Sequence, residues 1–412
     1  MSDSSRPKAV VLLNNIVPYH DARWRAAAAL FSHCVVVEMT NRDEFRALEV
    51  AQKSPGNYER VTLFPNAGQA EISTGKLTRK VQALLEQEKP TVVFVNGYSF
   101  FYNWIALEWG LRHQVPVVVC SESNEHDEPR SAWKEWVKRF FVSRCAAGLA
   151  GGTPQAAYLE KLGLPRTRLF TGYDAVDLEH FERGSARARN DESLQRERSG
   201  LPKRYFFSCA RFGKKKNIPG LIKAYAAYLH KISESSTTNP QSLVCDLVIA
   251  GEGEERGVLE KMIADLHLSE RVHLIGPKGY EELPGLYALA EAFIHASTTE
   301  QWGLVVNEAM ACGLPVLVSE RCGCAADLVQ AGVNGWVFNP HDQGELATLM
   351  LNIASDAALR NAMGAKSREI IANWGPARFA EGVSCAMEAG LSAPNRKFGL
   401  IDRLVFRLMA LR

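Results

Sequence analysis

Short apolar runs alternate with helical patterns along most of this chain, and the alternation begins twice. In the first half the apolar runs predict strands, at 9–13, 34–39, 91–95, 115–120 and 147–150. Helical patterns come between and after them, near 21–31, 77–87, 101–113, 132–142 and 154–162. Strands that alternate with helices of this length predict a parallel α/β sheet with helices on its faces.

A charged segment poor in apolar residues, 184–203, divides the two halves and is typical of a linker. After it the alternation restarts, with strands expected at 205–209, 243–249 and 272–275 and helices near 218–229 and 255–266. We therefore predict an N-terminal Rossmann-like domain over 1–183 and a second one over 204–374. A length of 412 residues is enough for two such domains, each with its own core.

Charge and cysteine content narrow the functional classes. A formal net charge of +2 argues against a protein that binds nucleic acid. The nine cysteines are scattered, mostly within apolar patterns, which favours reduced thiols and a cytoplasmic protein. The polar start, 1–8, is followed by only a short apolar run, so neither a signal peptide nor a membrane-spanning helix is expected.

The most informative stretch, 300–319, reads as a loop, a helix, a turn and a strand. Its helix is expected from Leu304 to Cys312, and Gly313 is placed to cap it in a left-handed conformation. At the helix start, Gly303, Leu304 and Val305 present backbone N–H groups that have no intrahelical acceptor. This pattern predicts an anion site.

Two carboxylates flank that anion site. Glu300 belongs to the loop before the helix, and Glu308 lies one turn inside it. A nucleoside diphosphate sugar needs such an arrangement, because its phosphates require donors while its ribose and sugar hydroxyls require acceptors. The alternative is an ordinary βαβ unit whose acidic residues merely cap and solvate a helix.

This stretch resembles the E-x7-E segment of retaining glycosyltransferases with the GT-B fold, family 4. The similarity continues through Gly323 and Asp327 to 334–340. It implies two Rossmann-like domains that face each other across a cleft, with a C-terminal crossover through which about 375–412 complete the first domain. It further implies that Glu308 takes ribose hydroxyls and that Glu300 orients the sugar ring.

A basic loop after the 205–209 strand resembles another segment of that family. Arg211 and Lys216 keep the family's five-residue spacing, which implies that they neutralise the departing diphosphate. A solvated basic loop is the alternative. The resemblance also places Gly253 beside the nucleotide and Pro277 and Lys278 beside the nucleobase. A dinucleotide fingerprint at 250–256 is weak, because its third glycine is missing.

Loops of the first domain are the candidates for acceptor binding, because ligands of open α/β sheets lie beyond the carboxyl ends of strands. Tyr19 and His20 follow the first strand, where a helix-capping loop is the alternative. Gly97 and Tyr98 follow the strand at 91–95 and form an aromatic, polar strand end suited to sugar contacts.

The loop at 121–129 holds a further candidate, since family members carry a substrate-contacting residue there, often a histidine. Glu122, Asn124 and His126 all compete for that place. We assign Asn124 to the acceptor and His126 to catalysis, and a solvated histidine in an acidic loop is the alternative.

Two segments mix apolar and basic residues at helical spacing, namely 133–144 and 396–412. In the second, Arg396, Arg403 and Arg407 share one face, and Phe398, Ile401, Val405 and Leu408 lie opposite. Both segments either dock on an anionic membrane surface or pack on the core.

Together with the resemblance, these features predict a retaining glycosyltransferase that moves sugar from a nucleotide diphosphate sugar to a glycan or lipid-linked acceptor. No cofactor or metal is expected, because the chain has no Asp-x-Asp. The expected location is cytoplasmic, with peripheral contact at the inner face of the membrane. The alternatives are a nucleotide-sugar epimerase or phosphorylase and a non-catalytic partner subunit with the same fold.

Overall fold

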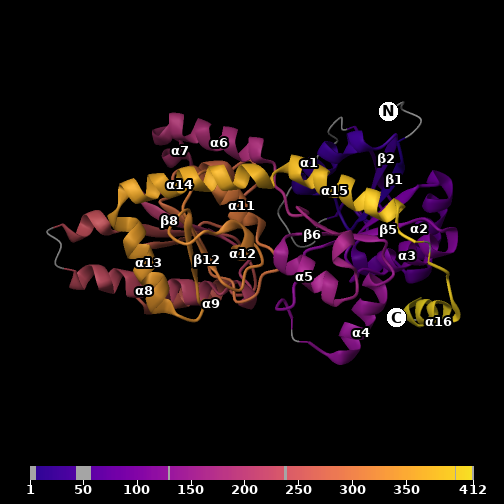
Figure 1. Ribbon diagram of the computed structural model, residues 1–412. Coiled ribbons are helices and arrows are strands. Elements are labelled where there is room, and N and C mark those ends of the chain that lie inside the picture. Colours follow the sequence, from indigo (N-terminus) through magenta and orange to yellow (C-terminus); the bar gives the residue numbers. More distant parts are fainter. Residues whose placement is uncertain (1–5, 43–56, 129, 236–238, 395, 411–412) are drawn as a thin grey trace. The chain divides into compact units, whose positions relative to one another are not determined.

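The computed structural model describes residues 6–42, 57–128, 130–235, 239–394 and 396–410, so the start of the polar N-terminal segment and Pro129 lie outside it. The chain forms two compact units (Figure 1). Unit 1 comprises Met1–Ala175 and Pro376–Arg412, and unit 2 comprises Val176–Gly375. The chain therefore returns to the first unit at its C-terminal end.

Unit 1 is built on a parallel seven-stranded sheet with the order β3-β2-β1-β4-β5-β6-β7. Its strands are β1 (Lys8–Leu13), β2 (His33–Glu38), β3 (Glu59–Thr62), β4 (Val92–Asn96), β5 (Val117–Ser121), β6 (Ala147–Ala150) and β7 (Leu169–Thr171). The order turns around at β1, so the switch point of this sheet lies between β1 and β4. Loops that follow these two strands border the place where such sheets bind ligands.

Both faces of the sheet are buried, which explains why its strands are almost continuously apolar. Val10 and Leu12 of β1 belong to one core cluster, and Ala9, Val11 and Leu13 belong to a second cluster. Alternate side chains of a strand point to opposite faces, so β1 contributes to a core on each side of the sheet.

Seven α-helices of unit 1 are described: α1 (Pro18–Ala27), α2 (Thr74–Glu88), α3 (Phe101–His113), α4 (Ala132–Val142), α5 (Thr153–Lys161), α15 (Pro376–Leu391) and α16 (Leu400–Ala410). The returning helix α15 packs against α1, and the rings of Trp24 and Phe379 meet edge to face at 5.1 Å. None of the helices within the described ranges is both long and apolar enough to cross a membrane.

Helix α16 divides its apolar residues between a buried side and an exposed side. Asp402, Val405 and Phe406 are buried, whereas Ile401 and Leu408 are exposed. The apolar face expected from the sequence is therefore only partly buried, since Val405 is covered and Ile401 and Leu408 are not. On the buried side, Val405 and Phe406 pack in the core of unit 1, and Arg144 Nε lies 2.6 Å from Asp402 Oδ1.

Unit 2 contains a parallel six-stranded sheet with the order β10-β9-β8-β11-β12-β13. Its strands are β8 (Tyr205–Cys209), β9 (Asp246–Ala250), β10 (Val272–Leu274), β11 (Ala292–His295), β12 (Val316–Ser319) and β13 (Gly335–Phe338). Counted along the unit, this is the Rossmann order 3-2-1-4-5-6, whose switch point lies between its first and fourth strands, β8 and β11.

The helices of unit 2 are α6 (Leu178–Asn190), α7 (Glu192–Ser199), α8 (Ile218–Glu234), α9 (Arg256–Asp265), α10 (Leu283–Ala288), α11 (Leu304–Ala311), α12 (Ala325–Leu328), α13 (Gln343–Ser355) and α14 (Ala357–Ile371). The linker expected at 184–203 is therefore wrong, because α6 and α7 occupy most of it. Helix α6 buries only Phe181, Ser185 and Ala188, a stripe too narrow to show in its composition. The first unit also ends at Ala175 and not at residue 183.

Candidate functional site

The carboxyl ends of β8 and β11 carry two loops that are bonded to each other at the switch point of unit 2. After β8 comes a 3-10 turn, Lys214–Lys216, and after β11 comes the loop that leads to α11. The N–H of Thr298 donates to the carbonyl oxygen of Lys215 at 2.9 Å. The Asn217 side-chain amide donates to the carbonyl oxygen of Ala296 at 3.1 Å. These bonds hold the basic turn against the acidic loop.

A cluster of four polar side chains lies where the two loops meet. Lys216 Nζ donates a hydrogen bond to Glu300 Oε2. His295 Nε2 lies 3.1 Å from the same oxygen, and Ser297 Oγ lies 3.3 Å from that ring nitrogen. The side chain of His295 is 2% exposed and that of Glu300 is 17% exposed. The family resemblance singled out Lys216 and Glu300, and the structure brings them into contact.

Burial and the neighbours of Glu300 act on its pKa in opposite directions. Burial would raise the pKa of Glu300, but the hydrogen bond to His295 and the charge of Lys216 together lower it from 4.5 to about 2. Burial lowers the pKa of His295 from 6.5, although Glu300 opposes this shift. At neutral pH Glu300 is therefore a carboxylate and His295 a neutral imidazole.

The variant Glu300→Gln is expected to lose about 2–3 kcal/mol of unfolding free energy at neutral pH. A carboxyl whose pKa is lowered by folding stabilises the protein above its unfolded pKa of 4.5, and that stabilisation is lost as the pH falls towards about 2. The difference between wild type and variant should therefore shrink below pH 4.5 in urea unfolding. Glu320→Gln is the control, because that residue follows β12 and its side chain is exposed. A deficit that stays constant with pH would contradict this assignment.

The N-terminus of α11 lies directly after this cluster. Gly303 has φ +107°, a conformation that favours glycine, and a Cβ there would meet Glu300 Cγ at 3.4 Å. The N–H of Val306 donates to the carbonyl oxygen of Gly303 at 2.9 Å. Leu304 and Val305 are the first helical residues, so their N–H groups have no intrahelical acceptor and point towards the N-terminal end.

Glu308, the second carboxylate of the motif, lies inside unit 2. It is 0% exposed, and its Oε2 accepts a hydrogen bond from the Tyr287 hydroxyl at 2.7 Å. The carboxylate is thus covered and bonded in this structure, so a ribose hydroxyl could reach it only after a local rearrangement. Its contact with ribose stays a prediction.

Arg211 and Gly253 lie together in the loops after β8 and β9. The Arg211 side chain is 56% exposed, and its Nη2 lies 3.7 Å from Glu254 Oε2, a distance typical of a weak surface pair. A Cβ on Gly253 would lie only 2.5 Å from the carbonyl oxygen of Phe212. The glycine therefore lets the turn after β9 approach the backbone of the loop that carries Arg211.

Pro277 and Lys278 lie beyond β10, two strands away from β8. Pro277 is exposed, and Lys278 Nζ lies 3.7 Å from Glu282 Oε1. The structure does not bring these two residues into the Lys216 cluster. Their place beside a nucleobase stays a prediction.

In unit 1, Tyr19 and His20 lie in the first turn of α1. Tyr19 is buried, and His20 Nδ1 accepts a hydrogen bond from the N–H of Val17 at 3.4 Å. This bond is the helix-capping arrangement that the sequence left as the alternative. The preceding loop is anchored by buried Glu38, whose Oε2 accepts from the N–H of Ile16 at 2.9 Å.

Gly97 and Tyr98 form the turn after β4. Gly97 has φ +82° with open space around its Cα, whereas the Tyr98 ring is buried against Phe141 with ring centroids 6.4 Å apart. Burial raises the pKa of Tyr98 to about 12. Tyr98 therefore belongs to the core in this structure, and its predicted sugar contact is not supported by its position.

The loop after β5 contains Asn124 and His126 in different environments. Asn124 is buried, and its Oδ1 accepts from the N–H of His126 at 2.8 Å, which closes a turn. The His126 side chain is exposed. Arg130 donates to the carbonyl oxygen of Asn124 and lies 2.9 Å from Asp127 Oδ1. This loop therefore presents His126 to solvent, while the Asn124 side chain stabilises the turn of the loop.

Some residues at these strand ends were not singled out from the sequence. His295 is one of them, and its position as a polar residue at the carboxyl end of the apolar strand β11 could have indicated a site. A second cluster was missed in unit 1, where Arg23 Nη2 lies 3.4 Å from Asp174 Oδ1 and both side chains are buried. Glu122 interacts with Asp174 there as well.

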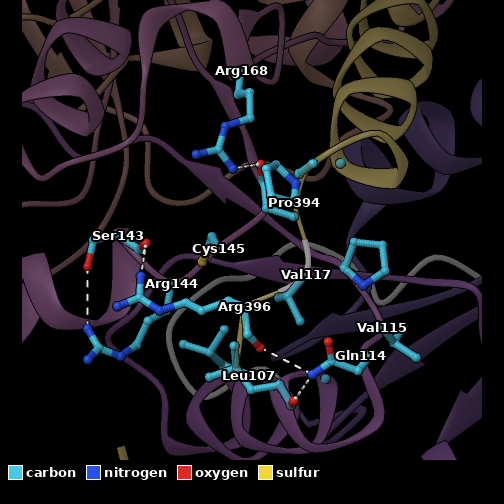
Figure 2. A pocket seen from close by; sticks show the side chains of 16 residues that line it. Leu107, Gln114, Val115, Val117, Ser143, Arg144, Cys145, Arg168, Pro394 and Arg396 are labelled. Carbon is cyan, nitrogen blue, oxygen red and sulfur yellow. Dashed lines mark hydrogen bonds between the residues drawn. The ribbon is translucent and has the colours of Figure 1, made fainter. Parts of the chain in front are cut away.

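A cavity of about 340 Å³ in unit 1 lies away from these strand ends (Figure 2). Pro116 and Val117 border it where β5 begins, and Ala146 borders it just before β6. It is thus at the amino ends of the strands, the edge opposite to that expected for substrate. Among all the described residues, no group of three or more His, Cys, Asp or Glu side chains is placed to hold a metal ion.

Two Rossmann-like units in one chain, with a C-terminal segment that returns to the first unit, define the GT-B class of glycosyltransferase folds. A family model described as "Glycosyl transferases group 1" matches residues 190–370, and a "Glycosyl transferase 4-like domain" model matches residues 19–171. The two matches together cover most of the chain. The chain belongs to the group 1 glycosyltransferases.

Characterised relatives are similar over part of their length. The D-inositol 3-phosphate glycosyltransferase 1 of Catenulispora acidiphila is 31% identical over 241 residues, which are 57% of this chain and 55% of the relative. The GDP-mannose-dependent alpha-(1-6)-phosphatidylinositol monomannoside mannosyltransferase of Mycolicibacterium smegmatis is 31% identical, over 52% of this chain and 56% of the relative. The matched part thus spans about half the length of these relatives.

One solved structure shares the fold across nearly the whole chain. The HepE protein of Anabaena, crystallised in complex with UDP, superposes with a TM-score of 0.70 at 18% identity. The superposition covers 93% of this chain and 100% of that one. At this identity the similarity concerns the fold.

Proposed function

We propose that this chain is a retaining, metal-independent glycosyltransferase that moves a sugar from a nucleotide diphosphate sugar to a hydroxyl acceptor. The observation that carries the proposal is the contact between Lys216, Glu300 and His295 at the switch point of unit 2. It joins a cation, a carboxylate and an imidazole beside the N-terminus of α11. A helix N-terminus attracts phosphate, and the carboxylate suits sugar hydroxyls.

In this proposal the N–H groups of Leu304 and Val305 take phosphate oxygens. Lys216 and Arg211 stabilise the negative charge that grows on the diphosphate as the sugar bond breaks. The Arg211 side chain is 56% exposed in the loop after β8, and its pair with Glu254 is a surface pair. Glu300 orients the sugar ring, and its low pKa keeps it able to accept hydrogen bonds over the neutral range.

The nucleoside is assigned to Glu308, Gly253, Pro277 and Lys278, as the family resemblance implies. We assign the acceptor to the strand-end loops of unit 1, with the exposed His126 and the half-buried Gly97, which has open space beside it, as the residues best placed to meet it. A lipid-linked or glycan acceptor is favoured, since one relative is named for its action on a phosphatidylinositol monomannoside. We place the enzyme in the cytoplasm, at the inner face of a membrane, with the C-terminal helix α16 as its contact.

The test is a thermal-unfolding screen of the purified chain with UDP, GDP, ADP and their sugar conjugates, in the presence of EDTA. One nucleotide family should raise the midpoint, since a ligand at about 100 times its Kd stabilises the folded state by about 2.7 kcal/mol. Lys216→Met should reduce the shift. Lys214→Met, an exposed lysine of the same turn, should keep it.

Three outcomes would contradict the proposal in different ways. A folded protein that responds to none of these ligands would favour a non-catalytic partner subunit. A shift that requires a divalent cation would exclude the metal-independent form. Consumption of the donor without any acceptor, or only with inorganic phosphate, would favour an epimerase or a phosphorylase.

A further inference from the structure

Helix α16 exposes an apolar stripe that no described part of the chain covers. Leu400 is 82% exposed, Ile401 68%, Leu404 60% and Leu408 54%. The spacing of these residues places them on one side of the helix, away from the buried Val405 and Phe406. An isolated exposed leucine is ordinary, but four on one stripe mark a binding surface.

Helix α4 lies next to α16 and exposes two tryptophans. Trp133 and Trp136 are stacked with ring centroids 5.0 Å apart, and they are 56% and 45% exposed. The aromatic contacts continue from Trp136 to Phe140 at 5.9 Å and from Phe140 to Phe406 of α16 at 5.8 Å. Figure 1 shows both helices along the lower edge of unit 1.

The six exposed side chains form what we call the α4–α16 face: Trp133, Trp136, Leu400, Ile401, Leu404 and Leu408. Among the described residues, the other large hydrophobic side chains that are exposed occur singly on other elements or between them. Two helices that contact each other thus carry six of the ten large hydrophobic side chains that are exposed among the described residues. Tryptophan is the side chain that most favours the boundary between lipid headgroups and acyl chains.

Basic residues border the face. Lys134 and Arg139 are exposed on α4, and Arg403 and Arg407 are exposed on α16. Further guanidinium groups line the cavity beside the segment that leads into α16, where Arg396 Nη1 donates to the carbonyl oxygen of Ser143 at 2.8 Å (Figure 2). An apolar stripe with tryptophans and a basic rim is complementary to an anionic bilayer and poorly suited to an acidic soluble protein.

We propose that the α4–α16 face docks unit 1 on an anionic lipid bilayer, with the leucines and tryptophans in the headgroup region. Helices α4 and α16, which lie about 270 residues apart in the sequence, therefore act as one surface. Docking through α4 would also hold the loop after β5 near the lipid. Arg130 links α4 to this loop, because its Nη1 lies 3.2 Å from Glu135 Oε1 of α4 and its Nη2 lies 2.9 Å from Asp127 Oδ1 of the loop.

The acceptor that reaches His126 is consequently a lipid whose polar headgroup bears the hydroxyl, presented at the bilayer surface. In naming the acceptor, this inference rests on the proposed function. The docking itself is tested independently, because vesicle binding needs neither a donor nor an acceptor.

The experiment is co-sedimentation of the full chain with vesicles of phosphatidylcholine alone and of phosphatidylcholine with phosphatidylglycerol in equal parts. The wild type should bind the anionic vesicles and leave the neutral ones largely free. Ile401→Glu with Leu404→Glu should reduce binding to anionic vesicles at least about tenfold for each residue. The double variant Trp133→Ala with Trp136→Ala should also reduce binding to anionic vesicles. Arg403→Gln should reduce binding about fivefold, and only to anionic vesicles.

Val258→Glu is the matched control, because Val258 is 59% exposed on α9 of unit 2 and should leave vesicle binding unchanged. All variants alter exposed residues, so their unfolding midpoints should equal that of the wild type. Unchanged vesicle binding by the α16 double variant would overturn the proposal, as would an equal loss in Val258→Glu. A dimer that Leu404→Glu dissociates, seen by light scattering, would show that a second copy covers the face instead.

The nucleotide-dependent rise in unfolding midpoint, measured without vesicles, separates this inference from the proposed function. Variants of the α4–α16 face should keep that rise. Nucleotide binding without vesicle binding would overturn the docking alone, and vesicle binding without any nucleotide response would overturn the proposed donor site alone.

Discussion

Lys216→Met is expected to lower kcat for sugar transfer by about 10²–10³-fold, with a smaller change in the KM for the donor. Lys216 is the cation in contact with Glu300 at the switch point, and in our proposal it stabilises the charge that develops on the leaving diphosphate. An interaction that strengthens in the transition state lowers kcat when it is removed. The measurement is release of nucleoside diphosphate with the donor that the thermal screen identifies.

A pH profile distinguishes this role from a purely structural one. Lys216 helps to keep the pKa of Glu300 low, so its loss should raise that pKa and move the acid limb of kcat to higher pH. Lys214→Met should keep both the rate and the profile of the wild type. A Lys216→Met enzyme that retains most of its activity would exclude the proposed role.

Arg23→Met is expected to lower the free energy of unfolding by about 3 kcal/mol. Arg23 is 1% exposed, and its guanidinium is held by three contacts in the core of unit 1. Its Nη2 lies 3.4 Å from Asp174 Oδ1, its Nε donates to the carbonyl oxygen of Ala175 at 2.8 Å, and its Cζ lies 5.0 Å from the centroid of the Tyr173 ring. Methionine fills much of the space but leaves a buried carboxyl without its cation.

The deficit should depend on pH. Burial and the neighbouring Glu122 raise the pKa of Asp174 well above 3.8, while Arg23 opposes that rise. A carboxyl whose folded pKa is raised contributes its full stability below its unfolded pKa and loses it as the pH rises through the folded value. Without Arg23 the folded pKa is higher still, so the deficit of the variant should grow as the pH rises.

Urea unfolding of wild type and variant in mildly acidic and mildly alkaline buffer measures this difference. Arg25→Met is the control on the same helix, because its pair with Asp21 is partly exposed and should be worth less than about 1 kcal/mol. Equal deficits for the two variants would show that the buried pair adds nothing beyond a surface pair.

Most of the secondary structure could be predicted because its signals are local. The strands at 9–13 and 205–209 lie within a residue of β1 and β8, and the helix expected at 304–312 is α11. The edge strands β3 (Glu59–Thr62) and β7 (Leu169–Thr171) were not predicted. Each is short, and β3 contains charged residues because an edge strand is only partly buried.

The site was predictable in its chemistry but not in its contacts. The spacing of Glu300 and Glu308 and the cations at Arg211 and Lys216 indicated a diphosphate sugar site, and the family comparison confirms the class of protein. That His295 would share Glu300 Oε2 with Lys216 could not be read from spacing, because β8 and β11 become neighbours only through the strand order of the sheet.

The periodicity of apolar residues dictated the α/β class and both Rossmann-like units, because side-chain direction along a helix or strand follows from backbone geometry alone. Burial depends instead on which elements pack together. The charged segment 184–203 forms the last part of α6 and α7, and α6 packs against α10, while the Tyr287 hydroxyl bonds the buried Glu308. In α16, Asp402 is buried and pairs with Arg144, whereas four apolar side chains of the same helix are exposed. These outcomes depend on residues distant in sequence, and no local pattern contains them.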